Sequence, residues 1–177
     1  MSELKDLLII GGGAAGLVSA ITAKKENPKL LVTVVEKLDR VGKKLITTGN
    51  GRCNISNTDA SLSCFHGEDT SFASFALDTL GNEKIKEFFS LIGIEFSEEN
   101  GKLYPASFQA SSVVDCLRFE CAKLGVEILC CHTVKQIKKG KIFTVIGEDF
   151  EIRAKAIIVA TGLFSGGEKL GSDGSVY

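Results

Sequence analysis

Short apolar runs alternate with helix-compatible stretches at the start of the chain. Residues 7–10 are all Leu or Ile and lead into three consecutive glycines. Residues 17–25 suit a helix, and residues 30–35 form a second apolar run that ends at Glu36. A strand, a glycine turn, a helix and a second strand in this order are typical of a βαβ unit. The pattern therefore predicts an α/β fold built on a parallel sheet, with helices on both faces.

The hydrophobic periodicity disappears between residues 37 and 70, where Gly, Asn, Ser and Thr are frequent. A loop that long inside a compact domain is usually functional or disordered. Two helices are predicted after it, and Gly93 is expected to end the second. Both predictions depend on apolar residues at helical spacing, which are Phe72, Phe75, Ala76 and Leu80, then Ile85, Phe88, Phe89 and Ile92.

In the second half of the chain, the pattern of turn residues and apolar positions predicts a hairpin, a helix and several strands. The hairpin covers residues 95–104 and turns at Glu99-Asn100-Gly101. Ser111 or Ser112 is expected to cap a helix that runs to about residue 124, and residues 126–130 to form a strand. Three alternating segments predict an antiparallel β-meander inserted beside the main sheet, and a buried strand over residues 156–160 follows; the three segments are 134–138, 141–146 and 150–154.

Composition narrows the class of protein. The 177 residues carry a formal net charge of −1, and the Lys and Glu residues are interspersed. Such a chain has no general attraction to nucleic acid or to anionic membranes. Acidic residues precede the first apolar run and glycines interrupt it, which disfavours a signal peptide. No segment approaches the roughly 20 apolar residues of a membrane span. We therefore expect a cytoplasmic protein.

The six cysteines do not form a metal or redox motif. The sequence contains no Cys-x-x-Cys, and the two histidines do not complete a zinc pattern. Most of the cysteines are therefore expected to be small buried apolar residues. Cys130 and Cys131 are expected on a strand, where adjacent side chains point to opposite faces. No metal site is predicted.

The first glycine turn carries the clearest chemical signal. Gly11, Gly13 and Gly16 form Gly-x-Gly-x-x-Gly between a strand and a helix. The glycines permit a tight turn, a close approach of phosphate and close packing of helix on strand. The helix N-terminus presents free N–H groups to a pyrophosphate, and Glu36 can accept hydrogen bonds from ribose hydroxyls. A dinucleotide site is predicted, and the turn alone fits both NAD and FAD.

The loop that follows Glu36 combines glycines, cations and amides. Its Lys43, Lys44 and Arg52 can neutralise phosphate or an anionic reduced flavin. Asn50 and Asn54 can pair with the polar edge of a heteroaromatic ring. This combination predicts a ligand-binding loop.

These motifs together resemble the bacterial BaiN/RdsA-type NAD(P)/FAD-dependent oxidoreductases. The resemblance covers nearly the whole chain, and its most specific part is the hexapeptide Gly49-Asn50-Gly51-Arg52-Cys53-Asn54. The other matching segments are Gly11–Gly16, Val35-Glu36-Lys37, Val41–Leu45, Gly101–Pro105, Ala110–Leu117, Ala160-Thr161-Gly162 and Gly171–Tyr177.

The resemblance implies FAD as the cofactor and a Rossmann-like FAD-binding fold. It implies that the ADP half of FAD lies on the glycine turn and Glu36, that a backbone group near Val134 lies beside the adenine, and that residues 160–162 approach the diphosphate or the ribityl chain. Residues 48–54 would approach the flavin ring. The implied cofactor-binding residues are Gly11, Gly13, Ala14, Ala15, Gly16, Glu36, Lys37, Lys44, Thr48, Asn50, Gly51, Arg52, Cys53, Asn54, Val134, Ala160, Thr161 and Gly162.

The implied reaction is hydride transfer from NADH or NADPH to FAD, and then to an organic acceptor such as a conjugated enone. Arg52 or Lys44 could stabilise the reduced flavin. Cys53 lacks a resolving partner, so a packing role is expected for it, and no catalytic residue is assigned.

The chain departs from the family at its end. Leu163 stands where the family has a second glycine, and the order of residues 171–174 differs. Family members are much longer, so the chain is expected to be the N-terminal part of an FAD-binding domain. An inserted substrate domain and a C-terminal return would be absent or belong to a separate chain. Two alternatives remain open, an NAD-binding dehydrogenase and a non-catalytic nucleotide-binding fragment or subunit. A flavoprotein that modifies tRNA is disfavoured by the near-neutral charge and the lack of a basic stripe.

Overall fold

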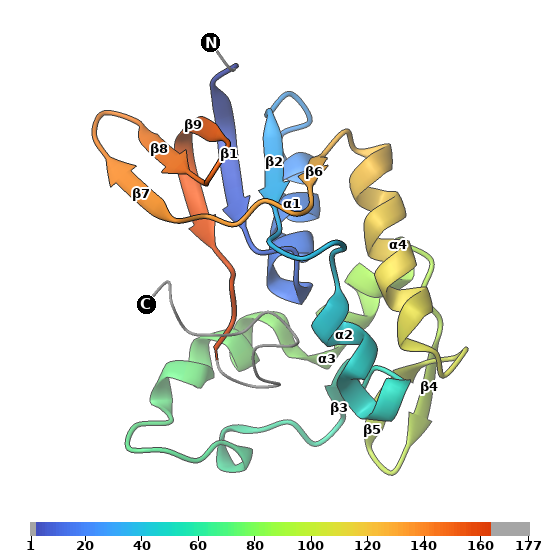
Figure 1. Ribbon diagram of the computed structural model, residues 1–177. Coiled ribbons are helices and arrows are strands. Elements are labelled where there is room, and N and C mark those ends of the chain that lie inside the picture. The colour runs from blue at the N-terminus through green and yellow to red at the C-terminus, as the bar shows by residue number, and fades with distance from the viewer. Residues whose placement is uncertain (1–2, 164–177) are drawn as a thin grey trace. The chain divides into compact units, whose positions relative to one another are not determined.

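The computed structural model describes residues 3–163 (Figure 1). The chain divides into two compact units. Unit 1 comprises Met1–Leu45 and Leu117–Tyr177, and unit 2 comprises Ile46–Cys116. Each unit has its own sheet. Within residues 3–163, no helix is both long enough and apolar enough to span a bilayer.

Unit 1 is built on one six-stranded sheet with the order β6-β2-β1-β9-β8-β7 (Figure 1). The four strands β6, β2, β1 and β9 are parallel. Leu8 of β1 is aligned to Thr33 of β2 on one side and to Ile157 of β9 on the other. The β7–β8 hairpin continues the sheet in antiparallel pairing. The strands are β1 (Lys5–Ile10), β2 (Val32–Val35), β6 (Glu127–Leu129), β7 (Gln136–Lys139), β8 (Phe143–Ile146) and β9 (Glu151–Val159).

The meander differs from its prediction in one respect. Its third strand and the strand predicted over residues 156–160 are a single strand, β9, because no turn residue separates them. Residues 151–154 of β9 pair with β8, and residues 154–159 pair with β1. The meander is therefore part of the main sheet. Ala156 is exposed and Ile157 half-buried, so this segment is less buried than predicted.

Helix α1 (Ala14–Glu26) covers one face of the sheet. Its Leu17, Ala20 and Ile21 are fully buried, as are Ile9 and Val34 on adjacent strands. Complete burial of a Leu or Ile side chain stabilises the folded protein by about 1.5–3 kcal/mol. This burial holds the helix against the sheet. Figure 1 shows α1 behind β1 and β2.

Strand and loop side chains form the core cluster on the other side of β1. Leu8 and Ile10 pack there with Val35, Val145 and Ile152. Its half-buried members also come from strands and loops, namely Leu129, Val134, Ile137, Phe150, Ile157 and Val159. Within the described residues, the meander therefore contributes side chains to this cluster.

Helix α4 (Ala110–Lys123) begins slightly earlier than predicted. Ser112 does not cap it, because its hydroxyl donates back to the carbonyl of Gln109 at 2.7 Å from within the first turn. In the second half of the helix, Leu117 and Cys121 are fully buried. The sulfur of Cys121 lies 4.0 Å from the carbonyl oxygen of Leu17, so this half packs against α1.

Unit 2 contains a small antiparallel sheet with the order β3-β5-β4. The hairpin turning at Asn100-Gly101 is confirmed, with Ser97 aligned to Tyr104. The predicted loop over residues 37–70 holds short helices and one short strand. The elements are α2 (Lys43–Thr47), which crosses from unit 1, η1 (Thr48–Gly51), β3 (Ser56–Asn57), η2 (Leu62–Cys64), η3 (Ser71–Ala73), α3 (Ser74–Leu91), β4 (Phe96–Glu99) and β5 (Lys102–Pro105).

The two helices predicted between residues 72 and 92 correspond to the two halves of α3. Gly81 breaks the helix with φ 40° and ψ 169°. The second half is held by edge-to-face contacts of Phe89 with Phe88 and with Phe96 of β4, at 5.3 and 6.4 Å between ring centroids.

Leu8→Ala is expected to lower the free energy of unfolding by about 2–5 kcal/mol, because the fully buried side chain would leave a cavity between the strands. Urea denaturation measures the loss. Leu31→Ala is the matched control, since Leu31 is 41% exposed and should change stability by less than about 0.5 kcal/mol. Equal effects of both substitutions would contradict this assignment of the core.

Candidate functional site

The turn between β1 and α1 passes close to the end of β9. The N–H of Gly11 donates to the carbonyl of Val35 at 2.8 Å, and Gly11 adopts φ +106°. A Cβ on Gly11 would lie 2.5 Å from the carbonyl oxygen of Ala160. Only glycine satisfies both the conformation and the approach, so this residue brings two distant loops together.

Gly16 and Gly13 have different roles. A Cβ on Gly16 would lie 1.9 Å from the carbonyl oxygen of Gly11, so glycine is required for the helix to start this close to the turn. A Cβ on Gly13 would meet nothing within 4 Å, and Ala14 and Ala15 are exposed. The first turn of α1 contains no acidic residue. Its N–H groups therefore face open space and can bind an anion.

Glu36 is fixed by two backbone donors. The N–H of Gly12 donates to one carboxylate oxygen at 2.7 Å, and the N–H of Leu38 donates to the other at 2.9 Å. Each oxygen retains a lone pair, so the carboxylate can still accept hydrogen bonds from a ribose. Gly12 also accepts from the N–H of Gly42 at 2.8 Å, and a Cβ on Gly12 would lie 2.4 Å from a methyl of Val41.

No role was predicted for Gly12 from the sequence. The only signal was that Gly12, the middle of three consecutive glycines, stands at a position where the Gly-x-Gly-x-x-Gly spacing does not require glycine. The structure shows that this residue ties the turn to Glu36 and to the loop after β2.

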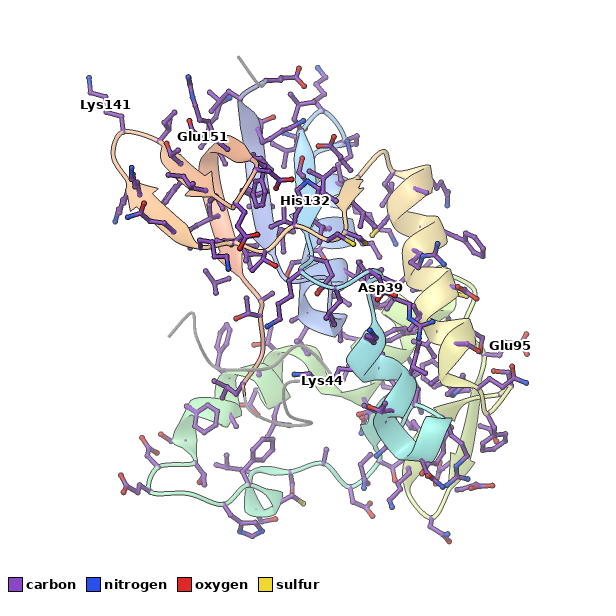
Figure 2. The ribbon with its side chains drawn as sticks, in the orientation of Figure 1. Asp39, Lys44, Glu95, His132, Lys141 and Glu151 are labelled. Atoms are coloured by element: carbon purple, nitrogen blue, oxygen red, sulfur yellow. The ribbon has the colours of Figure 1, made fainter. Side chains whose placement is uncertain are left out.

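The chain leaving β6 lies beside Glu36. The N–H of His132, a residue labelled in Figure 2, donates to the Glu36 carbonyl at 2.9 Å. The His132 ring packs on Phe150 at 4.9 Å between centroids. Val134 is half-buried in the core cluster. It lies in the loop before β7, and its predicted backbone contact with an adenine remains a prediction.

The residues after β9 lie against the turn between β1 and α1. Ala160 donates its N–H to the Ile10 carbonyl at 2.8 Å, and Gly162 adopts φ +71°. The hydroxyl oxygen of Thr161 is buried and, among residues 3–163, has no hydrogen-bond partner. Leu163 is exposed. The matching segment 171–177 lies outside the described residues.

Unit 2 carries the second group of predicted residues in a sharply turned loop. Asn50 and Cys53 both have positive φ, and the N–H of Cys53 donates to the Thr48 carbonyl at 2.9 Å. A Cβ on Gly49 would lie 2.6 Å from the backbone nitrogen of Asn54. The residues of this loop that are exposed are Asn50, Gly51 and Asn54.

Arg52 braces this loop through contacts that the sequence analysis missed. Its guanidinium forms an ion pair with Glu99 at 2.8 Å and a 3.3 Å hydrogen bond to the Tyr104 hydroxyl. It also stacks on the Tyr104 ring at 4.4 Å and lies 5.9 Å from the Phe108 ring. Its charge is therefore already balanced by Glu99. The residues lie 47 and 52 positions apart in sequence, so no local pattern could indicate the pairing.

The lysines that precede this loop in the sequence belong to unit 1. Lys43 pairs with Asp39 at 3.1 Å, and its ammonium group keeps the pKa of that carboxyl below its usual range. Lys37 and Lys44 are half-buried. Figure 2 shows Lys44 on α2 and Asp39 on the loop before it.

The predicted burial of most cysteines is wrong. Cys53 and Cys121 are buried, whereas Cys64 and Cys131 are exposed. Strand β6 ends at Leu129, and Cys131 has φ +60°, so Cys130 and Cys131 do not continue the strand. Within residues 3–163, no three His, Cys, Asp or Glu side chains lie in position to bind a metal.

The environments of the buried thiols oppose a redox role. Burial raises the pKa of Cys53, although a hydrogen bond with the Thr48 side chain lowers it in part. Burial also raises the pKa of Cys121 to about 11. At exposed Cys64, hydrogen bonding to Ser61 lowers the pKa.

Comparisons with known proteins show which family and fold the chain resembles. A family model described as HI0933-like protein Rossmann domain matches residues 5–177. The 3-dehydro-bile acid delta(4,6)-reductase of Clostridium scindens is 39% identical over 172 residues, covering 96% of this chain and 41% of the reductase. The ribosomal RNA dihydrouridine synthase of Haemophilus influenzae is 32% identical over 171 residues, covering 92% of this chain and 41% of the synthase.

Solved structures share the fold at low sequence identity. The 3-ketosteroid-delta4-(5alpha)-dehydrogenase of Rhodococcus jostii matches with a TM-score of 0.63 and 13% identity, over 93% of this chain and 47% of the dehydrogenase. The THI4 protein of Thermovibrio ammonificans matches with a TM-score of 0.62 and 14% identity, over 94% and 60% of the two chains. These matches confirm the predicted Rossmann-like fold and, with the relatives, the BaiN/RdsA-type resemblance.

Gly16→Ala is expected to destabilise the protein by about 1–3 kcal/mol or more, because the new methyl group would overlap the Gly11 carbonyl. Gly140→Ala is the matched control, since a Cβ there would lie 3.6 Å from its nearest neighbour, an ordinary contact. Urea denaturation compares the two variants. A Gly16→Ala variant as stable as Gly140→Ala would contradict the close packing of the turn.

Alkylation with iodoacetamide at pH 8 is expected to modify Cys64 first and Cys53 and Cys121 last. With a pKa of about 11, about one Cys121 thiol in a thousand would be ionised at that pH, and burial also blocks access. Peptide mass spectrometry over time measures each rate. Labelling of Cys53 as fast as that of Cys64 would contradict its burial and would favour a reactive thiol.

Proposed function

The chain belongs to the HI0933-like family of Rossmann domains, and from that premise we propose that it binds FAD as part of an oxidoreductase. The proposed reaction takes a hydride from NADH or NADPH and delivers it to a small organic acceptor. One observation carries the proposal: the open N-terminus of α1, the braced carboxylate of Glu36 and the buried hydroxyl of Thr161 belong to loops that meet at Gly11.

The residues of unit 1 fit the parts of FAD. The N–H groups after Gly13 suit the diphosphate, because they face open space at the positive end of a helix. Glu36 suits the ribose hydroxyls of the ADP half. Thr161 has a buried hydroxyl without a partner in the described residues, and a polar group of the ligand would satisfy it. The predicted adenine contact at Val134 completes this assignment.

When bound, FAD supplies the hydride chemistry, and the protein supplies binding and orientation. The backbone N–H groups of the first turn of α1 would hold the diphosphate, and Glu36 would fix the ribose. Lys44 and Arg52 remain the predicted cations beside a reduced flavin, and the Arg52 guanidinium also pairs with Glu99. The exposed amides of Asn50 and Asn54 remain predicted contacts of the flavin ring.

The names of the relatives and the net charge of the chain favour one class of electron acceptor. The relative at 39% identity is named as a bile acid reductase and the one at 32% as a ribosomal RNA enzyme. A net charge of −1 gives no electrostatic attraction to RNA. We therefore favour a small organic acceptor, such as a conjugated enone, over RNA.

The chain spans 41% of the length of both relatives. Turnover is therefore proposed for the longer flavoprotein, which would add a substrate domain and the remainder of the flavin site. The 177-residue chain would itself provide the binding site for the ADP half of FAD.

The experiment is an anaerobic visible spectrum of the purified chain with FAD, followed by NADH and then NADPH. A bound-flavin spectrum is expected, and bleaching would support electron transfer from the nicotinamide. FAD binding without bleaching would indicate a nucleotide-binding unit that needs more polypeptide. Binding of NAD without any binding of FAD would overturn the proposal in favour of an NAD-dependent dehydrogenase.

Gly13→Ala is expected to weaken FAD binding by about tenfold or more, because its methyl group would stand where the diphosphate approaches. Nothing lies within 4 Å of that methyl in the protein, so stability should fall by less than about 1 kcal/mol, the usual effect at a helix N-cap. Flavin fluorescence titration measures affinity, and urea denaturation measures stability. Unchanged affinity would contradict the assignment, and Gly140→Ala controls for the substitution itself.

A further inference from the structure

An apolar surface lies over η3 and the first half of α3. Phe72, Phe75 and Leu80 are 75%, 78% and 54% exposed. Phe72, Ala76 and Leu80 are four positions apart, so they follow one side of the helix. No residue of Ser74–Leu91, all of which the structure describes, is buried. We call the side chains of Phe65, Phe72, Phe75, Ala76, Leu77 and Leu80 the apolar face.

A cavity of about 310 Å³ opens beside this face. Five of the six residues of the apolar face line it, together with Ile85. At its polar end, the Ser56 hydroxyl donates to the side-chain oxygen of Asn82, and the Asn82 amide donates to the Asn57 carbonyl at 2.8 Å. These polar groups satisfy one another, so the cavity offers apolar contact.

The first half of α3 contains no buried residue. Gly81 separates it from the second half, which Phe89 anchors to β4. A helix of about two turns is not stable in water without tertiary packing. A partner surface on the apolar face would supply that packing.

The segment that carries the apolar face is acidic, which favours a partner with basic residues. Residues 53–86 contain five acidic residues and two lysines, a net charge of −3 (2 − 5); the acids are Asp59, Glu68, Asp69, Asp78 and Glu83. The Lys84 ammonium donates to the Thr79 carbonyl at 2.6 Å, and Lys86 pairs with Glu83 at 3.3 Å. A second copy of the chain would bring like charges together, and an anionic lipid surface would be repelled. A surface with an apolar centre and a rim of Lys and Arg is complementary.

We propose that the apolar face is the docking surface for additional polypeptide of a longer protein. That polypeptide corresponds to the part of the relatives that lies outside their match to this chain. The chain spans 41% of those relatives, so the longer protein has enough additional polypeptide to cover it. This inference rests on the proposed function only in assuming the longer flavoprotein. It adds where the additional polypeptide binds and that its contact surface is apolar with a basic rim.

The test joins the full chain to the segment of the Clostridium scindens reductase that lies outside the match. Hydrogen–deuterium exchange is compared between this fusion and the chain alone. Amides of residues 72–80 are expected to exchange at least about tenfold more slowly in the fusion, whereas those of β1 should not change. Equal exchange of residues 72–80 in both proteins would overturn the proposal.

A matched pair of variants assigns the protection to side chains. Phe72→Ser/Phe75→Ser in the fusion should abolish most of the protection, and Phe119→Ser, at a residue 68% exposed on α4, should preserve it. Because all three side chains are exposed, each variant should fold. Protection that survives the double substitution would place the contact elsewhere and would overturn the proposal.

A second measurement uses the chain alone, so that the proposal stays testable if the fusion does not fold. A helical Leu/Lys peptide of about 18 residues is expected to bind, with an affinity that falls with salt and drops about tenfold in Phe72→Ser/Phe75→Ser. A Leu/Glu peptide of the same length should not bind. Equal binding of the two peptides, concentration-dependent self-association through the face, or preferential binding to neutral lipid vesicles would each overturn it. Neither measurement reads flavin, so loss of docking and loss of FAD binding are separable results.

Discussion

The hydrogen bond from the Gly12 N–H to the Glu36 carboxylate is the contact on which the candidate site depends. It joins the end of β1 to the end of β2, and Leu38 holds the second carboxylate oxygen. The orientation of Glu36 is therefore set by the backbone before any ligand binds. Because the same turn also passes Ala160 closely, three loops converge at the carboxyl ends of parallel strands. Ligands of open α/β sheets bind at this edge.

The local parts of the fold could be predicted from the sequence. Strand β1, helix α1 and the strand ending at Glu36 follow from apolar periodicity and glycine spacing, and the hairpin at Asn100-Gly101 follows from turn chemistry. The two halves of α3 were predicted from apolar residues at helical spacing. Each of these features depends on residues near one another in the chain.

Features that depend on distant residues were missed. The strand predicted over residues 156–160 is the continuation of the meander, because β9 has partners on both sides that only the folded sheet provides. Arg52 was predicted to neutralise phosphate or a reduced flavin, and its ion pair with Glu99, 47 positions away, was not foreseen. The same limitation applies to the cysteines, because burial is a property of the tertiary fold: Cys53 is buried and Cys64 exposed, although both lie in the same polar segment. The role of Gly12 also needed the position of Glu36.

The central claim is that the turn from Gly11 to Gly16 binds the diphosphate of FAD, and phosphorus-31 NMR tests it most directly. The two diphosphate resonances of FAD are followed as the chain is added, with NAD as a parallel ligand. The account predicts that both FAD resonances shift and broaden until the protein is in excess. FAD resonances that remain unchanged in excess protein, or a change with NAD alone, would contradict it.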